Sequence, residues 1–136
     1  MRFEQIHHVA YVVGDIDAAL PLYMERFGMP LEIREVLADQ GVEAAALGVG
    51  RGHVELIQPL DPESSVGRFL ERRGEGLHHV AFEVPNLEDA LDELRSAGVD
   101  LIDQAPRRGL GGHRIAFVHP RSSGGVLTEL VESDVH

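Results

Sequence analysis

The sequence predicts an α+β fold in which two paired βαβββ modules form a cupped, open mixed β-sheet barrel with its helices outside. The first observation behind this prediction is an internal repeat, in which a strand-like His-His segment occurs twice. The second is that an acidic, helix-opening stretch follows each copy. The third is that each half closes on a similar apolar segment containing one glutamate. The repeated pairs are 6–13 with 77–84, 15–20 with 86–91, and 54–57 with 128–131. Such a repeat indicates two modules that bury their faces against each other.

The first strand and helix follow from local patterns. Residues 6–13 alternate and are rich in β-branched side chains, which predicts a strand. Asp15 or Asp17 is expected to cap a helix that runs to about Phe27. Pro21 lies inside this helix and should bend it or remove one of its hydrogen bonds. Three more strands are expected at 31–37, 42–47 and 54–58.

The second half is expected to repeat this order after a Pro-rich connection. Ser64 or Ser65 could cap a short helix that runs through Arg73. The helix of the second module should run from about Asn86 to Ala97. Its strands are expected at 77–84, 99–103, 113–118 and 126–132. We therefore expect one domain over 1–136, with modules at about 4–60 and 75–133 and a linker at about 59–76.

Composition places the chain among ordinary soluble globular proteins. Of its 136 residues, 43% are hydrophobic and 26% are charged. No apolar run reaches the roughly 18 residues that would suggest a membrane span. The start of the chain lacks the pattern of a signal peptide, so we expect a cytoplasmic protein. There is no cysteine, which excludes disulfides and thiolate catalysis.

The charge of the chain limits the classes of binding partner that we expect. A formal net charge of −11 argues against nucleic acid or an anionic membrane as the main partner. All 12 basic residues are arginine, so Schiff-base catalysis and a lysine base are excluded. The pairs Arg72-Arg73 and Arg107-Arg108 are either solvated surface or a binding place for the phosphate groups of an anionic ligand.

In each repeat, strand alternation places the two neighbouring histidines on opposite faces of the strand. Neighbouring side chains of a strand point to opposite faces. His7 and His78 share their faces with large apolar residues, which favours a structural role at the strand ends. His8 and His79 share theirs with small or polar residues, which favours a face that borders a cavity. His8 and His79 are therefore the candidate metal ligands.

Glu55 and Glu129 complete the candidate site. Each lies in an apolar strand, where burial of a carboxylate costs several kcal/mol unless a cation or hydrogen bonds compensate it. Two imidazoles and two carboxylates suit a divalent ion such as Co, Ni, Mn, Fe or Zn, without discriminating among them. Four histidines have no repeated partner and are left out of the ligand set: His53, His113, His119 and His136.

Nearly the whole chain resembles the methylmalonyl-CoA epimerase family of the vicinal oxygen chelate superfamily. The order and span of several motifs make this resemblance specific. They lie at 6–11, 39–42, 55–60, 74–82, 111–120 and 124–130. The resemblance implies metal ligands at His8, His79 and Glu129, with Glu55 at a position that is glutamine or glutamate in relatives. It also implies a cobalt ion, an acyl-CoA substrate and a homodimer.

The implied reaction is interconversion of (R)- and (S)-methylmalonyl-CoA through removal and return of the proton alpha to the thioester. A divalent metal would stabilise the enolate as a Lewis acid. Some relatives carry a proposed base at the position of Ala44. Glu43 is adjacent, but strand alternation places it on the opposite face. We therefore expect Glu129 and Glu55 to act as the catalytic carboxylates, with Glu43 as a further candidate.

Three other functions are open to a chain of this pattern. A glyoxalase-type isomerase would use the same metal and proton abstraction on a glutathione adduct or another thioester. A metal-free protein that binds a small molecule would have no need of four inward ligands at matched positions. A ring-cleaving dioxygenase fits less well, because it typically uses two histidines and one carboxylate with iron, and the second glutamate would block an open position.

Overall fold

The computed structural model describes residues 1–134, so His136 lies outside the described residues. The chain divides into two compact units. We call Val9–His78 the continuous unit, and Met1–His8 together with the chain from His79 onward the split unit. The boundaries fall inside strands β1 (Gln5–Val12) and β5 (Gly76–Val84), so both strands contribute residues to both units.

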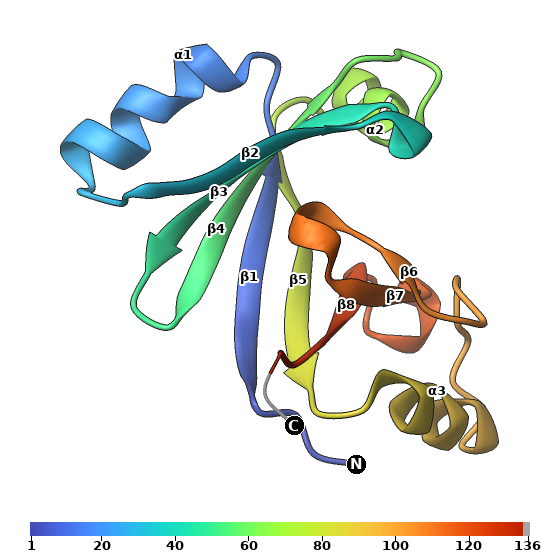
Figure 1. Ribbon diagram of the computed structural model, residues 1–136. Helices are drawn as coiled ribbons and strands as arrows, with labels where there is room; N and C mark the ends of the chain where they lie inside the picture. Colours follow the sequence, from blue (N-terminus) through green and yellow to red (C-terminus); the bar gives the residue numbers. More distant parts are fainter. Residues whose placement is uncertain (135–136) are drawn as a thin grey trace. The chain divides into compact units, whose positions relative to one another are not determined.

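The continuous unit is a sheet with helices on its faces. In hydrogen-bonded order its strands are β2, β3, β4 and β1, and β3 runs antiparallel to both β2 and β4 (Figure 1). The apolar face with Leu47 and Leu56 packs against α1, and the face with Val42 and Ile57 packs against α2. The elements are β2 (Leu31–Leu37), β3 (Val42–Val49), β4 (Gly52–Pro59), α1 (Ile16–Pro21) and α2 (Ser65–Arg73).

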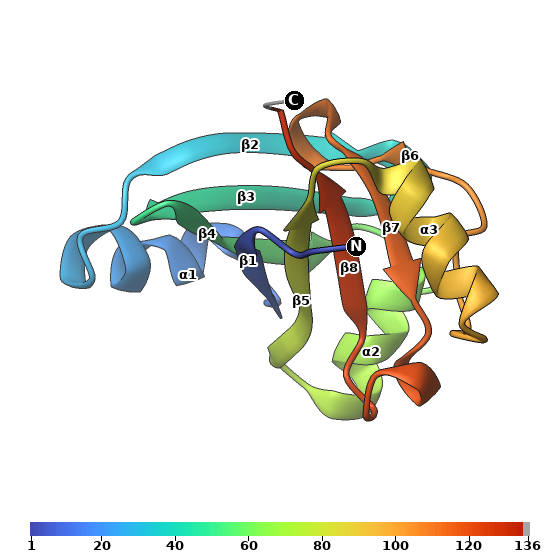
Figure 2. The ribbon, with the colours of Figure 1, turned by 90° about the horizontal axis from the view of Figure 1, so that it is seen from below.

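The split unit has a helix on one face of a mixed sheet. From β1 the order is β5, β8, β7 and β6, with β8 parallel to β5 and antiparallel to β7. Helix α3 lies along β7 and β8 (Figure 2) and packs on Leu130 and Ala116. The elements are β6 (Arg107–Arg108), β7 (Arg114–Val118), β8 (Thr128–Glu132) and α3 (Leu87–Ser96). The predicted α+β class and the mixed sheet are confirmed.

The helices begin where the sequence predicts. The side chains of Asp15, Ser64 and Asn86 each accept a backbone N–H of the first turn of their helix. The first helix differs from the prediction at its end, because α1 stops at Pro21 and continues as a π-helical turn, Leu22–Arg26. Proline has no N–H to donate, and a wider turn accommodates this defect. Among residues 1–134, no helix is long and apolar enough to cross a membrane.

The predicted strand at 99–103 is wrong. Only an isolated bridge between Leu101 and Val118 forms there, and the short β6 pairs with β7 instead. The Asp103 carboxylate accepts the backbone N–H of Phe117 at 2.8 Å, so a side chain takes the donor that a longer ladder would use. The strands predicted at 113–118 and 126–132 begin later, at Arg114 and Thr128.

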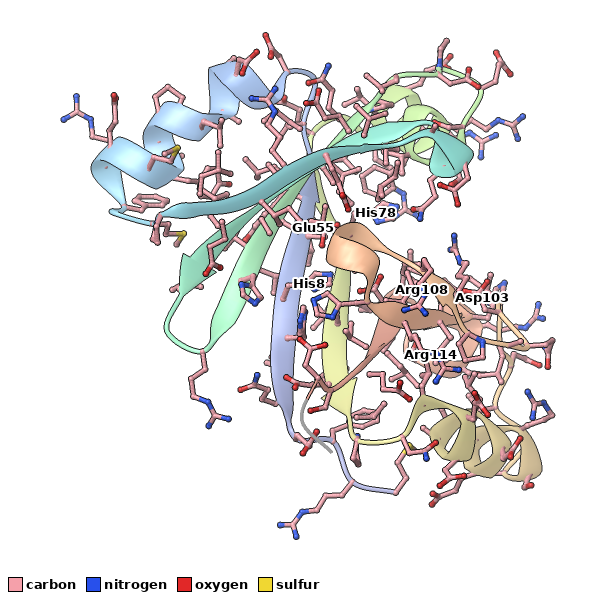
Figure 3. The ribbon with its side chains drawn as sticks, in the orientation of Figure 1. His8, Glu55, His78, Asp103, Arg108 and Arg114 are labelled. Carbon is pink, nitrogen blue, oxygen red and sulfur yellow. The ribbon has the colours of Figure 1, made fainter. Side chains whose placement is uncertain are left out.

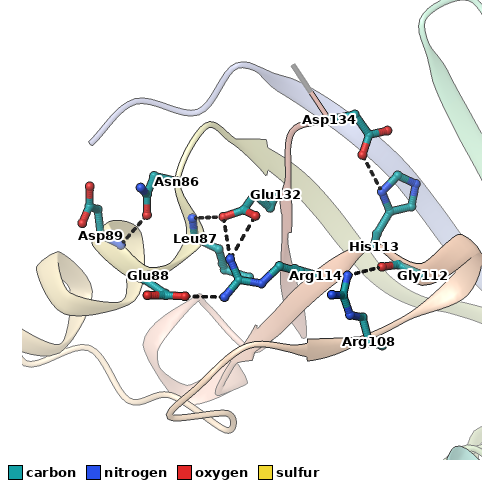
Figure 4. A network of polar contacts seen from close by, with 10 residues as sticks. All are labelled: Asn86, Leu87, Glu88, Asp89, Arg108, Gly112, His113, Arg114, Glu132 and Asp134. Carbon is teal, nitrogen blue, oxygen red and sulfur yellow. Dashed lines mark hydrogen bonds and ion pairs between the residues drawn. The ribbon is translucent and has the colours of Figure 1, made fainter. Parts of the chain in front are cut away.

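An ion-pair network joins β7, β8 and the start of α3 (Figure 4). Arg114 donates to Glu132 at 3.0 Å and also to Glu88. Glu132 in turn accepts the backbone N–H of Leu87 at 2.9 Å, which satisfies a free donor at the helix start. These two carboxylates hold the guanidinium in its charged form and raise the pKa of Arg114. The network fixes the end of β8, the strand that also carries Glu129.

We expect Gly67→Ala to destabilise the protein, although alanine normally favours a helix. A Cβ at Gly67 in α2 would lie 2.5 Å from the carbonyl oxygen of Asp61 and 2.7 Å from that of Pro62. Relieving this overlap requires a backbone shift, which costs about 1–3 kcal/mol. Urea unfolding of the variant measures the loss. Arg68→Ala is the control, because the Arg68 side chain is largely exposed; equal stability of the two variants would contradict the expectation.

Candidate metal centre

Strand geometry places three candidate ligands on one face of the split unit. His79 and Ala81 share a face of β5, and Ala81 is the partner of Glu129 on the parallel strand β8. Phe117 on β7 is the antiparallel partner of Glu129. This face is opposite the one that α3 covers, and its apolar residues are Ala81, Ile115, Phe117 and Val131. His8 lies on β1 (Figure 3), and its ring contacts the ring of His79.

The three side chains converge through their outer atoms. His8 Nε2 lies 3.0 Å from His79 Nε2 and 3.0 Å from Glu129 Oε2. His79 Nε2 lies 3.8 Å from the same carboxylate oxygen. One ligand atom from each residue thus lies within 4.8 Å of the other two, and all three side chains are buried. These residues could hold a metal ion.

The burial of Glu129 fits a divalent cation. Its Oε2 is buried and has no hydrogen-bond partner among the described residues. His8 Nε2 lies 3.0 Å from this oxygen, but the contact is not a hydrogen bond, and it is an ion pair only when the histidine is protonated. An uncompensated buried carboxylate is costly, and a cation at the meeting point of the three ligand atoms would compensate it. Two imidazole nitrogens and a carboxylate oxygen are ligands that divalent transition metals accept.

Phe117 and Asp103, which the sequence analysis did not single out, lie beside His79 together with Arg107 of the Arg107-Arg108 pair. The edge of the His79 ring meets the Phe117 ring, with 5.3 Å between centroids. The Arg107 guanidinium lies over Phe117 at 5.3 Å and is paired with Asp103 at 3.2 Å. Alternation along β7 could have placed Phe117 on the ligand face. The sequence pattern contains no signal for the stacking of Arg107 on Phe117. This contact depends on the path of the irregular segment that precedes β6.

The chain has clear relatives. A sequence profile of the glyoxalase/bleomycin resistance protein/dioxygenase superfamily matches residues 7–117. The crystal structure of methylmalonyl-CoA epimerase from Mycobacterium tuberculosis is 39% identical in sequence. The TM-score is 0.92, with 96% of this chain and 88% of that chain covered. This chain belongs to the methylmalonyl-CoA epimerase family of that superfamily. It is therefore an isomerase.

Two further members of the epimerase family span the same length. A variant of the Streptomyces coelicolor methylmalonyl-CoA epimerase, in complex with 2-nitronate-propionyl-CoA, is 35% identical with a TM-score of 0.94. The match covers 98% of this chain and 100% of that chain. The ethylmalonyl-CoA/methylmalonyl-CoA epimerase of Cereibacter sphaeroides is 31% identical over 128 residues. These residues are 93% of this chain and 96% of that protein.

The fourth candidate ligand, Glu55, lies in the continuous unit. It is half-buried on β4, and alternation places it on the face opposite Val54 and Leu56, which pack with α1. In the β3–β4 ladder its partner is Ala46, and Ala44 faces Ile57. Ala44 and Glu55 therefore share one face of this sheet. Ala44, at the position where the family resemblance implies a base in some relatives, is fully buried.

Glu43 lies on the other face of β3, as alternation predicts. Its Oε2 accepts a hydrogen bond from Arg34 Nε at 2.8 Å. Arg34 also donates to Asp17 at 2.7 Å, and this contact lowers the pKa of the Asp17 carboxyl. Glu43 is thus engaged in an ion-pair network on the α1 side. The structure does not place it on the face of Glu55.

His78 and His7, the other histidines of the repeats, have surroundings that differ from each other. The ring of His78 packs edge-on against Phe69, with 5.0 Å between centroids. Burial, together with the nearby charge of Arg73, lowers the pKa of His78 to about 4. His78 is therefore a neutral packing residue, in line with the structural role expected of it. The ring of His7 packs against His113 at 5.3 Å.

Proposed function

We propose that the protein is a metal-dependent epimerase that interconverts (R)- and (S)-methylmalonyl-CoA by removing and returning the alpha proton. The observation that carries this proposal is the buried group of His8, His79 and Glu129, in which one carboxylate oxygen has no hydrogen-bond partner among the described residues. The group lies in a chain that is 39% identical to a methylmalonyl-CoA epimerase over nearly its full length. Solved relatives with methylmalonyl-CoA or 2-nitronate-propionyl-CoA bound support an acyl-CoA substrate.

The reaction requires stabilisation of negative charge and a controlled proton. The alpha carbon of methylmalonyl-CoA lies between a thioester and a carboxylate, and loss of its proton leaves an enolate. A divalent ion, when bound, supplies Lewis-acid stabilisation of that charge. His8, His79 and Glu129 would hold the ion, with Glu55 as the fourth ligand. The buried residues Ala81 and Val131 keep the face of the split unit that carries these ligands apolar.

Carboxylate side chains carry out the two proton transfers of the proposed reaction. One carboxylate takes the alpha proton, and a carboxylic acid on the opposite face of the planar enolate returns a proton to the same carbon. We assign these roles to Glu129 and Glu55. Ala44 has no titratable group, and Glu43 is held by Arg34. This assignment therefore departs from relatives that carry a glutamate at the position of Ala44.

The donor set leaves the choice of ion open. Cobalt is our first choice on the family resemblance, and Ni, Mn, Zn and Fe suit the same ligands. The acyl group could also be ethylmalonyl, because one relative is an ethylmalonyl-CoA/methylmalonyl-CoA epimerase.

Exchange of the alpha proton in deuterium oxide tests the proposal. Protein loaded with Co²⁺ is mixed with methylmalonyl-CoA, and a chelator-treated sample serves as the control. We expect deuterium to enter the alpha position only in the metal-loaded sample. Parallel reactions with ethylmalonyl-CoA and with the hemithioacetal of methylglyoxal and glutathione report the preferred substrate.

The outcomes separate the candidate functions. Metal-dependent exchange on an acyl-CoA supports the epimerase. Bound metal with turnover of the hemithioacetal alone would replace it with a glyoxalase-type isomerase. A protein that binds no metal and exchanges no proton would instead be a small-molecule binding protein of the same family.

A further inference from the structure

His7, the residue before the candidate ligand His8, contacts it through a ring nitrogen. His7 Nδ1 and His8 Nδ1 are 2.8 Å apart, which is hydrogen-bond distance. The Nε2 atom of His8, at the far side of the same ring, lies 3.0 Å from both His79 Nε2 and Glu129 Oε2. The His8 ring therefore lies between His7 and the other two ligands.

This arrangement fixes the roles of the two nitrogens of His8. A neutral imidazole has one N–H and one lone pair. If Nε2 gives its lone pair to a metal ion, the proton must be on Nδ1. That N–H then donates to His7 Nδ1, which has to be the unprotonated nitrogen of its ring. The contact thus selects one tautomer of each histidine.

The ring of His7 is itself held in place. It packs edge-on against the ring of His113, with 5.3 Å between centroids. His113 Nδ1 in turn lies 3.4 Å from a carboxylate oxygen of Asp134 (Figure 4). All of these residues belong to the split unit, as do the three candidate ligands. The contact with His113 therefore helps to hold the His7 ring in the position in which it meets His8.

We propose that His7 is a positioning residue for the metal centre, which accepts the Nδ1–H of His8 and thereby directs His8 Nε2 at the metal. This inference rests on the metal site of the proposed function. Partners of this kind fix the orientation and basicity of a metal-binding imidazole, and their loss typically lowers metal affinity about 10–100-fold.

Two substitutions of His7 separate hydrogen bonding from packing. His7→Asn places its side-chain oxygen the same number of bonds from the backbone as Nδ1, so it can still accept from His8. His7→Leu fills similar space without an acceptor. His119→Gln is the control for loss of a histidine in the same unit. His119 Nδ1 accepts the backbone N–H of Arg121 beyond the end of β7.

The primary measurement is the dissociation constant for Co²⁺, obtained by competition with a chromophoric chelator on the full chain. We expect His7→Leu to weaken binding about 10–100-fold, and His7→Asn and His119→Gln to remain within about threefold of the wild type. The visible absorption of bound Co²⁺ should change in His7→Leu and be restored in His7→Asn. Urea unfolding of the metal-free variants checks that each is folded.

Equal Co²⁺ affinities of His7→Leu and His7→Asn would overturn the role of His7 and leave the proposed function intact. A wild-type protein that binds no Co²⁺, Ni²⁺, Mn²⁺, Zn²⁺ or Fe²⁺ would overturn the metal centre and the role of His7 together. Loss of affinity in His7→Leu with recovery in His7→Asn supports the inference even if another substrate is turned over.

Discussion

Glu129→Gln is expected to change stability in opposite directions without and with metal. In the metal-free protein the substitution removes a buried negative charge whose Oε2 has no hydrogen-bond partner among residues 1–134, so the free energy of unfolding should rise by about 1–3 kcal/mol. With metal, the variant should lose the stabilisation that binding gives the wild type. The rate of alpha-proton exchange should fall by at least about 10²–10³-fold. Urea unfolding with and without a chelator measures the first two effects, and deuterium incorporation measures the third.

Glu132→Gln provides the matched control three residues along the same strand. Glu132 accepts from Arg114 and from the Leu87 backbone, so its neutralisation should lower stability with and without metal. A metal-free Glu129→Gln protein that is less stable than the wild type would argue that Glu129 has a partner in the folded protein. That result would remove the main argument for a cation at this site.

Glu55→Gln is expected to separate proton transfer from metal binding. The family resemblance implies glutamine or glutamate at this position, so the amide oxygen should retain the ion with a loss of affinity below about tenfold. Glutamine cannot accept a proton, so epimerisation should slow by about 10²–10⁴-fold. Glu55→Ala should lose metal affinity as well. Steady-state kinetics with methylmalonyl-CoA measure the epimerisation rate, and competition with a chelator measures the metal affinity.

Glu32→Gln is the control for the loss of a carboxylate from the continuous unit. Glu32 is paired with His53 at 2.9 Å, and its side chain is half exposed. We expect an unchanged rate in this variant. If Glu55→Gln retained the wild-type rate and Glu43→Gln lost it, the base would be Glu43, and its ion pair with Arg34 would have to open during the reaction.

Local features of the fold could be read from the sequence. The capping residues Asp15, Ser64 and Asn86 lie where the predicted helices begin, because a cap needs only a short polar side chain and the first turn. The strand predicted at 99–103 does not form, and the reason is a contact that is not local in the sequence. The Asp103 carboxylate takes the backbone donor of Phe117, a residue 14 positions away, and no local pattern contains that contact.

The sequence by itself determined which histidine of each repeated pair belongs to the candidate site. Strand alternation distinguished His8 and His79 from their neighbours, because it depends only on the period of two along a strand. Tertiary structure decided which atoms meet. His8 and His79 are 71 residues apart, yet their Nε2 atoms approach to 3.0 Å beside Glu129. It also decided that Glu129 Oε2 has no hydrogen-bond partner among residues 1–134, because this depends on packing between strands distant in the sequence. The contact of His7 with His8 joins neighbours on one strand that alternation places on opposite faces, so only the positions of the two side chains reveal it.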